Sequence, residues 1–584
     1  MKPMTKLIRG TSLTAALCLV LGAAFAQQQQ QPWSQRMANA TMARWPDGRM
    51  VAPGAKWASN ADLGILLNGI DAAWYNTANG DDYHYIQRAI DHLIATDGSI
   101  PNFNSKSDSP DTFALGRSLL LLYRVSQNKK YYTAATELHQ AIPSQISIYG
   151  LYSAGPFYAE YAYLFHEPQD FANLTKQFVS MNRQARSPRT GARDVGWYMM
   201  AIVDTLPYYS DNDPRRAQLL AILSQNATFL SRHQDSQSGL WRETISGPAA
   251  PDNFLSPSAS CMFTYALQKA VRLGYLPERY SQSASRAWQA ILLDFVQTNS
   301  DGTITLTPSD DAISTGSFML AATEMEMAPQ ATLARGQTVM VDAWFNSQQR
   351  ANAAGQKQYF HYKWTDFSNS GFSLLGHIFQ SHGAKLAMLT EAPTLARLRD
   401  AQIYFIVSPD IPKWNPNPNY VQPEDAEQVA EWVKQGGVLV LMENDPANAD
   451  LDHFNLIAQK FGLHFDNVLK HHVVEPHHGP AFIPITGDGP IFHQPHTLYM
   501  KDTCKISVKA PATAVFSDKE GIVIASAKYG KGMAVAVIDP WLYNEYTDHR
   551  KVHPAQQNFA AGQEFALWLI QRAQHNPHPQ EESR

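Results

Sequence analysis

The sequence contains little cysteine, with three in 584 residues. Cys18 lies close to the N-terminus, while Cys261 and Cys504 fall in different halves of the chain. Two distant cysteines do not make a disulfide framework, so each is expected to be a buried, small apolar residue. The fold must therefore be stabilised by its hydrophobic cores.

Charge is also sparse. Charged residues make up 17% of the chain, the formal net charge is -5, and no run is rich in Lys or Arg. Nucleic-acid binding needs clustered basic residues, so no nucleic-acid partner is expected. Hydrophobic residues reach 44%, and the length suits two or more domains with large cores.

Long apolar runs are confined to the N-terminus. Basic residues precede the apolar stretch 13–21, and Ala24-Phe25-Ala26 follows it as a small-residue cleavage signal. This pattern predicts a signal peptide over residues 1–26 and export to the periplasm or the extracellular space. The alternative, a membrane anchor, needs a longer apolar run, and no later segment is apolar enough to cross a membrane. Residues 27–32 are expected to form a Gln-rich linker.

Residues 33–328 predict one helix after another. Apolar residues recur at helical spacing, and the connections are short and carry Gly, Pro, Asp or Asn. The expected helices are 33–44, 62–76, 83–95, 114–126, 131–140, 170–183, 196–208, 215–233, 258–273, 280–298 and 316–325. Paired helices without strand signals indicate an all-α toroid of hairpins. The alternative is a helical solenoid, but the sequence shows no fixed-period repeat.

The pattern changes after residue 328. Residues 329–357 are expected to be a bridge, with a candidate strand at 338–345 and a flexible connector at 351–357. Over 358–575, strands alternate with helices, and 576–584 form a tail. The expected strands are 384–389, 403–407, 438–442, 521–527 and 533–539, and the expected helices are 423–435, 451–461 and 559–572. This alternation favours an α/β domain with a mostly parallel sheet between helices.

Several segments of the first domain match a known family. They are residues 42–48, 72–75, 97–100, 115–120, 150–162, 196–204 and 258–276. Together they span nearly all of 33–328 and resemble glycoside hydrolase family 105, the unsaturated rhamnogalacturonyl hydrolases, relatives of the family 88 unsaturated glucuronyl hydrolases. The resemblance implies an (α/α)6 barrel with the site in the barrel mouth, and no cofactor or metal.

The resemblance also implies a particular reaction. The substrate is a pectin-derived oligosaccharide that ends in a C4=C5 unsaturated uronic acid. An aspartic acid protonates C4, water adds at C5, and the resulting hemiketal collapses to release the next sugar. One carboxyl group must hold a proton and then act as a base, and a second carboxylate helps to set its pKa.

Four residues of this chain map onto the family's site. Asp111, five residues before Gly116, takes the place of the second carboxylate. Arg193 takes the place of an arginine that would pair with the uronate carboxylate. Trp57 and Trp197 are expected to line the sugar site.

The proton donor does not map, because Tyr149 occupies its position. A tyrosine pKa near ~10 makes proton donation weak at neutral pH. Tyr149 is instead a candidate substrate-binding residue. Asp194, next to Arg193, is a candidate replacement for the acid; its alternative role is that of a solvated residue at a helix start.

Three segments of the expected mouth are short: 143–148, 181–193 and 301–316. The helices are kept while the mouth is cut back. Three interpretations stay open. The chain is an exported hydrolase of unsaturated pectin fragments, or a non-catalytic oligosaccharide-binding or scaffold relative. The third is an enzyme with a relocated acid, with Asp111 as one candidate if burial raises its pKa.

The second domain resembles a flavodoxin-like fold of the class I glutamine amidotransferase type. The matching segments are 369–374, 436–445 and 528–546. That type needs a cysteine nucleophile on a strand-to-helix turn, whereas the turn after Val440 carries Glu443-Asn444-Asp445. A non-catalytic domain is therefore expected. The segment 539–541, at a strand's carboxyl end, is either a ligand-binding or a packing motif.

Two further patterns carry weaker signals. A metal site is one interpretation of the four clustered histidines His471, His472, His477 and His478. A solvated loop is favoured, because the only nearby acidic or cysteine residue that could support a metal site is Glu475. Residues 530–532 lack the spacing of a phosphate loop and indicate a strand turn.

Overall fold

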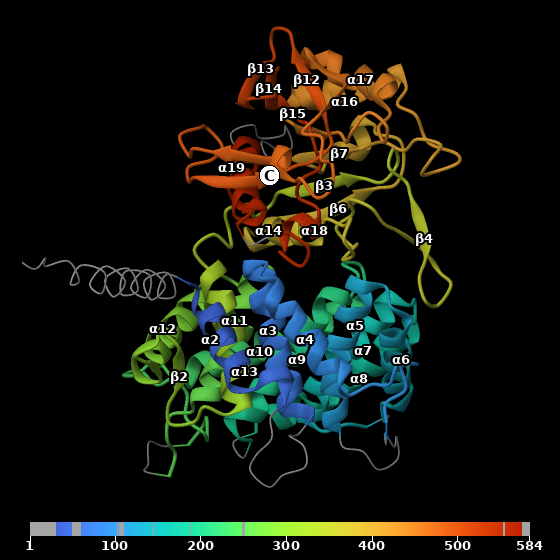
Figure 1. Cartoon of the computed structure of the whole chain (residues 1–584). Coiled ribbons are helices and arrows are strands. Elements are labelled where there is room, and N and C mark those ends of the chain that lie inside the picture. Colours follow the sequence, from blue (N-terminus) through green and yellow to red (C-terminus); the bar gives the residue numbers. More distant parts are fainter. Residues whose placement is uncertain are drawn as a thin grey trace, which may run out of the picture. The chain divides into compact units, whose positions relative to one another are not determined.

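The computed structural model describes residues 31–49, 60–101, 103, 110–143, 145–187, 190–247, 252–552 and 555–574. The expected signal peptide, the tail and most of the Gln-rich linker lie outside these residues. The chain divides into two compact units, the first ending at Ala328 and the second beginning at Pro329 (Figure 1). Two short segments, Thr77–Asp81 and Leu121–Tyr132, group with the second unit.

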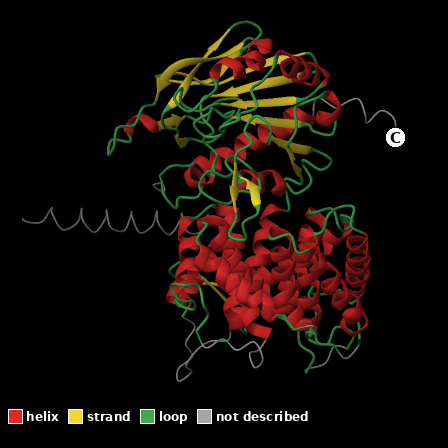
Figure 2. Ribbon diagram, turned by 90° about the vertical axis from the view of Figure 1, so that its right-hand side faces the viewer, coloured by secondary structure: helices red, strands yellow, loops and turns green. Residues whose placement is uncertain are grey.

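The first unit is built from helices, as expected from the sequence (Figure 2). Its α-helices are α2 (Trp33–Arg44), α3 (Asn60–Thr77), α4 (Gly80–Asp91), α5 (Gly116–Ser126), α6 (Lys129–Ala141), α7 (Ile148–Leu164), α8 (Pro168–Ala185), α9 (Ala192–Thr205), α10 (Pro214–Arg232), α11 (Pro257–Arg272), α12 (Arg279–Asp294) and α13 (Ala312–Met327). Short elements between them are the 3-10 helices η1 (Pro46–Gly48), η2 (Pro110–Leu115) and η3 (Leu206–Tyr208), and a hairpin of β1 (Val296–Thr298) and β2 (Ile304–Leu306).

Alternate helices form an inner ring. Helices α3, α5, α7, α9, α11 and α13 are buried along most of their length, whereas the helices between them expose one face. The ring closes because α13 packs against α3: a Cβ added at Gly316 would lie 2.6 Å from the carbonyl oxygen of Ile65. This closure distinguishes a six-hairpin toroid from the solenoid alternative.

The second unit contains a seven-stranded sheet in the order β13-β14-β15-β8-β7-β3-β6. Strands β15, β8, β7, β3 and β6 run parallel, and β14 and β13 extend the sheet antiparallel. The strands are β3 (Thr338–Asp342), β6 (Lys385–Leu389), β7 (Ile403–Val407), β8 (Val438–Met442), β13 (Thr513–Asp518), β14 (Gly521–Tyr529) and β15 (Gly532–Val537). Strands β7 and β8 are fully buried apolar runs, which is typical of parallel sheets covered on both faces.

The remaining elements of the second unit are helices and small sheets. The helices are α14 (Ser373–Ser381), α15 (Leu395–Leu398), α16 (Pro423–Gln435), α17 (Leu451–Ala458), η4 (Gln459–Phe461), η5 (Gly479–Ala481), α18 (Asn544–Thr547) and α19 (Asn558–Gln574). Two-stranded pairs are β4 (Gln349–Ala351) with β5 (Lys357–Tyr359), β9 (Leu463–Lys470) with β12 (Thr503–Val508), and β10 (Phe482–Ile485) with β11 (His496–Tyr499). No helix in the described part of the chain is long and apolar enough to span a membrane.

The segment expected to be a bridge differs from the prediction. Strand β3 lies inside the seven-stranded sheet, hydrogen-bonded to β6 on one side and β7 on the other. The segment expected to be a flexible connector forms part of the β4–β5 hairpin. The α/β region therefore begins before residue 358. Strand β3 directly follows a helical region, and its sheet partners β6 and β7 lie later in the chain, so the local pattern did not mark it as a sheet interior.

The inner ring predicts an effect of added volume at Gly116. A Cβ at Gly116, the first residue of α5, would lie 2.3 Å from the ring of Phe157 on α7. Gly116→Ala is therefore expected to destabilise the chain by about 1–3 kcal/mol, because either the ring or the helix must move. Chemical denaturation of the purified protein measures the change.

Gly155→Ala, within α7, is the matched control. A Cβ there would contact Leu174 at 3.5 Å, an ordinary van der Waals distance. This variant is expected to keep or raise the free energy of unfolding, since Ala favours a helix more than Gly does. Equal losses in the two variants would contradict the close α5–α7 contact.

Candidate active site in the helical unit

The inner helices of a closed ring of hairpins run in the same direction, and the first turns of α7, α9 and α13 lie at one end of the ring. We call this end the mouth. Helix α7 starts there, capped by Ser147, whose hydroxyl accepts a hydrogen bond of 3.0 Å from the backbone N–H of Gly150. The cap places Tyr149, the residue at the expected proton-donor position, in the first turn of α7.

Tyr149 packs against Trp197 of α9. The two rings meet edge to face with centroids 5.4 Å apart, and Tyr152 covers the same indole at 4.6 Å. Trp197 is buried, and Tyr149 and Tyr152 both pack against its ring. Tyr149 itself is half-buried. The structure thus brings two of the predicted site residues into contact.

Arg193 and Asp194 lie in the first turn of α9, and both are exposed at the mouth. Arg193 precedes Trp197 by four residues, which places both on one face of the helix. Partial desolvation raises the pKa of the Asp194 carboxyl, and the neighbouring Arg193 opposes that rise. A carboxyl group with a raised pKa that solvent still reaches can hold and release a proton.

A third charged residue of the mouth, Asp311, was missed from the sequence. It caps α13, where its carboxylate accepts a 2.7 Å hydrogen bond from the backbone N–H of Ser314. Burial alone would raise the pKa of Asp311, but this bond, the hydroxyl of Ser309 and the charge of Arg193 hold it below its ordinary value. Arg193 therefore acts electrostatically on carboxyl groups of two inner helices, α9 and α13. An Asp directly before a helical run was the available signal.

Of the two other predicted residues, Asp111 and Trp57, the structure describes only the backbone of Asp111. The backbone of Asp111 lies in η2, which leads into α5 and packs against α7. The side chain of Asp111, and the whole of Trp57, lie outside the described residues. Their roles stay predictions.

A buried ionic cluster lies deeper in the ring, at the far end of α9. Asp204 is fully enclosed and accepts hydrogen bonds from Arg117 at 2.9 Å, Lys269 at 2.7 Å and the hydroxyl of Tyr265 at 2.6 Å. Burial alone would raise the pKa of Asp204, but Lys269 and Arg117 outweigh it and hold the pKa below its usual value. The cluster joins α5, α9 and α11 and has no open acid to offer a substrate.

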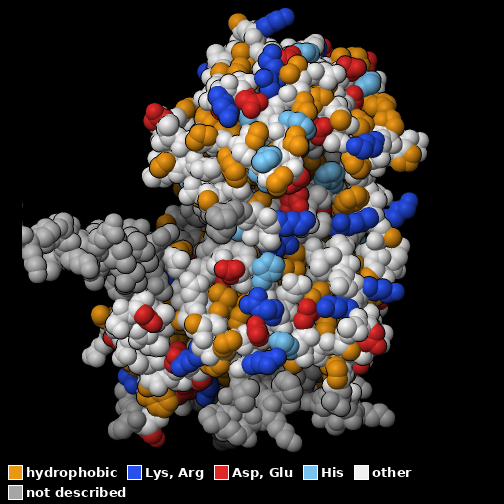
Figure 3. Space-filling model, in the orientation of Figure 1, with side chains coloured by type: hydrophobic (Ala, Val, Ile, Leu, Met, Phe, Trp, Pro, Cys, Tyr) orange, Lys and Arg blue, Asp and Glu red, His pale blue; other side chains and the backbone are white. Residues whose placement is uncertain are grey.

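The second unit keeps its expected motif residues buried. Asp539 and Trp541 have 2% and 0% of their surface exposed, which fits the packing alternative for segment 539–541. Cys504 is buried, and burial raises the pKa of its thiol, as is typical of a structural cysteine. Basic and acidic side chains are interspersed on the visible face of this unit (Figure 3).

The prediction of a solvated histidine loop is wrong at His471. His471 is not solvated: it is 2% exposed and bonded to Asp518 at 2.8 Å and to Thr503 at 2.9 Å. Its partners lie on β12 and β13, far from it in sequence, so the local pattern could not reveal them. Among the described residues, no group of His, Cys, Asp or Glu is arranged to hold a metal ion.

The helical unit is thus a closed ring of six helical hairpins with charged and aromatic residues at its mouth. The family described as Glycosyl Hydrolase Family 88 matches residues 33–192 and 184–328, about half of the chain. The chain belongs to this family.

Similar proteins have been described in bacteria. Protein Atu3128 of Agrobacterium fabrum and a 24.9 kDa protein in the picA locus of Rhizobium radiobacter are each 34% identical over 113 residues, which is 19% of this chain. This chain spans about half of the length of each relative, 48%. A solved structure of a C. acetobutylicum glycoside hydrolase from family 105 is 25% identical, with a TM-score of 0.46 over 51% of this chain and 99% of that one.

The charge coupling in the mouth can be measured directly. Replacing Arg193 by Gln removes a positive charge that lowers the pKa of both Asp194 and Asp311, so both pKa values are expected to rise. Carboxyl carbon chemical shifts, followed by NMR over a pH titration, report each group. Signals are assigned with Asp194→Asn and Asp311→Asn, and Arg232→Gln serves as a control on another helix. An unchanged pKa at both aspartates would contradict the coupling.

Proposed function

We propose that the helical unit hydrates the C4=C5 unsaturated uronic acid at the end of pectin-derived oligosaccharides, as an unsaturated rhamnogalacturonyl hydrolase-type glycoside hydrolase. The observation that carries this proposal is the pair Arg193 and Asp194 at the mouth of the family's helical ring. Arg193 supplies a cation for the uronate carboxylate, and Asp194 supplies a carboxyl group with a raised pKa.

The proposed reaction starts with the uronate held by Arg193. The protonated Asp194 carboxyl donates its proton to C4, while water adds to C5 and returns a proton to the Asp194 carboxylate. The hemiketal at C5 opens to a ketone, and the hemiacetal left at C1 releases the next sugar as an alcohol. One water is consumed and the acid is regenerated. Asp111 is the second proposed catalytic carboxyl, and Trp57, Trp197 and Tyr149 are proposed to bind the substrate.

The absorbance of the conjugated double bond tests this function. Purified protein mixed with lyase-generated unsaturated rhamnogalacturonan oligosaccharides is expected to lower the ultraviolet absorbance. Asp194→Asn is expected to reduce the rate by about 10²–10⁴, the contribution of a positioned general acid. Asp211→Asn, an exposed carboxyl near the start of α10, is the matched control and is expected to keep the rate. Equal rates in wild type and Asp194→Asn would exclude Asp194 as the acid.

A second candidate function is oligosaccharide binding without hydrolysis. Tyr149 favours it, since the residue stands where the family has its proton donor and packs on Trp197 instead. Tyr149→Asp restores a carboxyl at that position. No absorbance loss in wild type, followed by a loss in Tyr149→Asp, would identify a lapsed enzyme with an intact pocket. No loss in either protein supports a binding or scaffold role.

For the second unit we propose a non-catalytic domain of the flavodoxin-like, class I glutamine amidotransferase type. The support is its five parallel strands and the turn after β8, where Glu443 stands at the nucleophile position. Export to the periplasm or the extracellular space is proposed from the N-terminal sequence pattern.

A further inference from the structure

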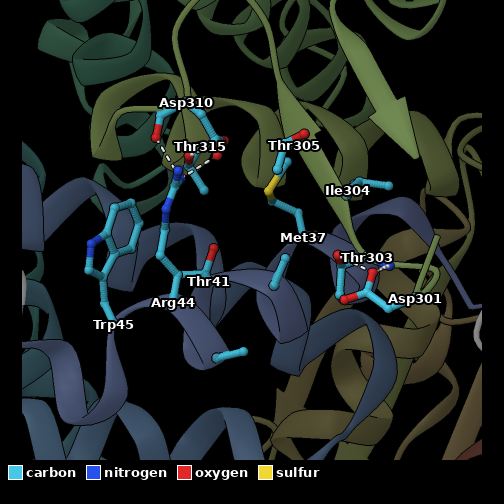
Figure 4. Close-up of a pocket in the computed structure, with 12 residues that line it drawn as sticks. Met37, Thr41, Arg44, Trp45, Asp301, Thr303, Ile304, Thr305, Asp310 and Thr315 are labelled. Carbon is cyan, nitrogen blue, oxygen red and sulfur yellow. Dashed lines mark hydrogen bonds and ion pairs between the residues drawn. The ribbon is translucent and has the colours of Figure 1, made fainter. Parts of the chain in front are cut away.

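The helical unit contains a pocket outside the residues assigned above. It has a volume of about 290 Å³ and lies between helix α2 and the segment 301–315. Figure 4 shows that Met37, Thr41, Arg44 and Trp45 rise from one side and face Thr305, Asp310 and Thr315 on the other. This volume lies just below the range of about 300–1,000 Å³ for ligand pockets, so it suits one small ring.

An ion pair fixes one end of the pocket. The guanidinium of Arg44 donates to the carboxylate of Asp310 and, at 2.8 Å, to its backbone oxygen. The other carboxylate oxygen of Asp310 accepts from the backbone N–H of Leu306 at 3.2 Å. Arg44 also lies over the indole of Trp45, 4.9 Å from its centroid. The charged groups are therefore held in place while Arg44 remains exposed toward solvent.

The floor of the pocket contains an unsatisfied hydroxyl. Thr41 is 2% exposed, and its Oγ1 has no hydrogen-bond partner among the described residues. A buried hydroxyl without a partner is destabilising, so its presence in a pocket wall points to a bound polar group that completes it. Met37 lies one turn away on the same helix, and its flexible side chain can move aside to admit that group.

The lining indicates the chemistry of the ligand. Apolar walls come from Met37 and Ile304, and hydroxyl or carboxylate groups come from the threonines, Asp301 and Asp310. One cationic and two anionic side chains give no surplus of positive charge for an acidic sugar. A neutral pyranose offers an apolar ring face together with hydroxyls that donate and accept, which matches this mixture.

We propose that this pocket binds one neutral pyranose unit of an oligosaccharide. The inference rests on the carbohydrate function proposed above. It concerns a different position from that of Arg193, which is proposed to hold an acidic sugar. The two positions are neighbours in the chain at one point, because Asp310 lines the pocket and Asp311 caps α13 at the mouth.

The test is a binding titration without turnover. The probes are the methyl glycosides of rhamnose, galactose and glucose, with methyl galacturonoside as the acidic comparison. The protein carries 5-fluorotryptophan, and the fluorine signal of Trp45 is assigned with Trp45→Phe. At least one neutral glycoside is expected to shift the Trp45 signal, and the acidic one is expected to bind more weakly.

Thr41→Val tests the floor of the pocket. It is expected to weaken binding of the neutral glycoside about fivefold, the effect of one neutral hydrogen bond. Its melting temperature is expected to stay the same or to rise, because a methyl group replaces an unsatisfied hydroxyl. A purely structural role for Thr41 would instead lower the melting temperature and leave binding intact.

Thr323→Val is the matched control. Thr323 is a buried threonine on α13 whose hydroxyl bonds to the carbonyl of Met319 at 2.9 Å. This variant is expected to lose some stability and to keep the affinity for the neutral glycoside. A Trp45 signal that no neutral glycoside moves, or an affinity that Thr41→Val leaves unchanged, would overturn the proposal. Because no turnover is needed, either result is independent of whether the mouth is catalytic.

Discussion

The buried carboxylate of Asp204 is the interaction on which the geometry of the helical unit most depends. Donors from α5 and α11 converge on it, so three inner helices share one charge. Removing the Asp204 carboxylate would leave the largely buried cations of Arg117 and Lys269 uncompensated, which costs about 3–5 kcal/mol. Helix α9 has 14 residues and is therefore about 20 Å long. The cluster fixes one end of this helix, and Arg193 and Asp194 stand at the other.

The residues at the mouth can therefore vary while the helical ring keeps its geometry. Close helix contacts and the Asp204 cluster need no particular chemistry at the first turns of α7, α9 and α13. This separation explains how the ring stays closed whichever residue stands at position 149, the expected donor position. At the start of α9, the Asp194 carboxyl has a raised pKa and lies next to Arg193. The charge of the same arginine lowers the pKa of Asp311, which caps α13.

Much of the fold could be predicted because its signals are local. The periodicity of the helices, and the apolar runs at 403–407 and 438–442, gave element types and in places the observed bounds. The place of β3 inside the sheet and the strands between 463 and 518 were not predicted, since strands paired over long distances carry little local signal. The contact of Tyr149 with Trp197, the burial of His471 and the pocket at Thr41 all join residues far apart in the chain. Their proximity depends on the tertiary structure, which no local pattern encodes.

The proposed roles of Arg193 and Asp194 are tested most directly by a crystal structure of the Asp194→Asn variant soaked with the unsaturated oligosaccharide. The uronate carboxylate is expected to pair with the guanidinium of Arg193. The C4 atom is expected to lie ~3–3.5 Å from the side chain at position 194, the separation of reacting atoms in a productive complex. A uronate bound away from Arg193, or a C4 atom out of reach of position 194, would contradict these roles.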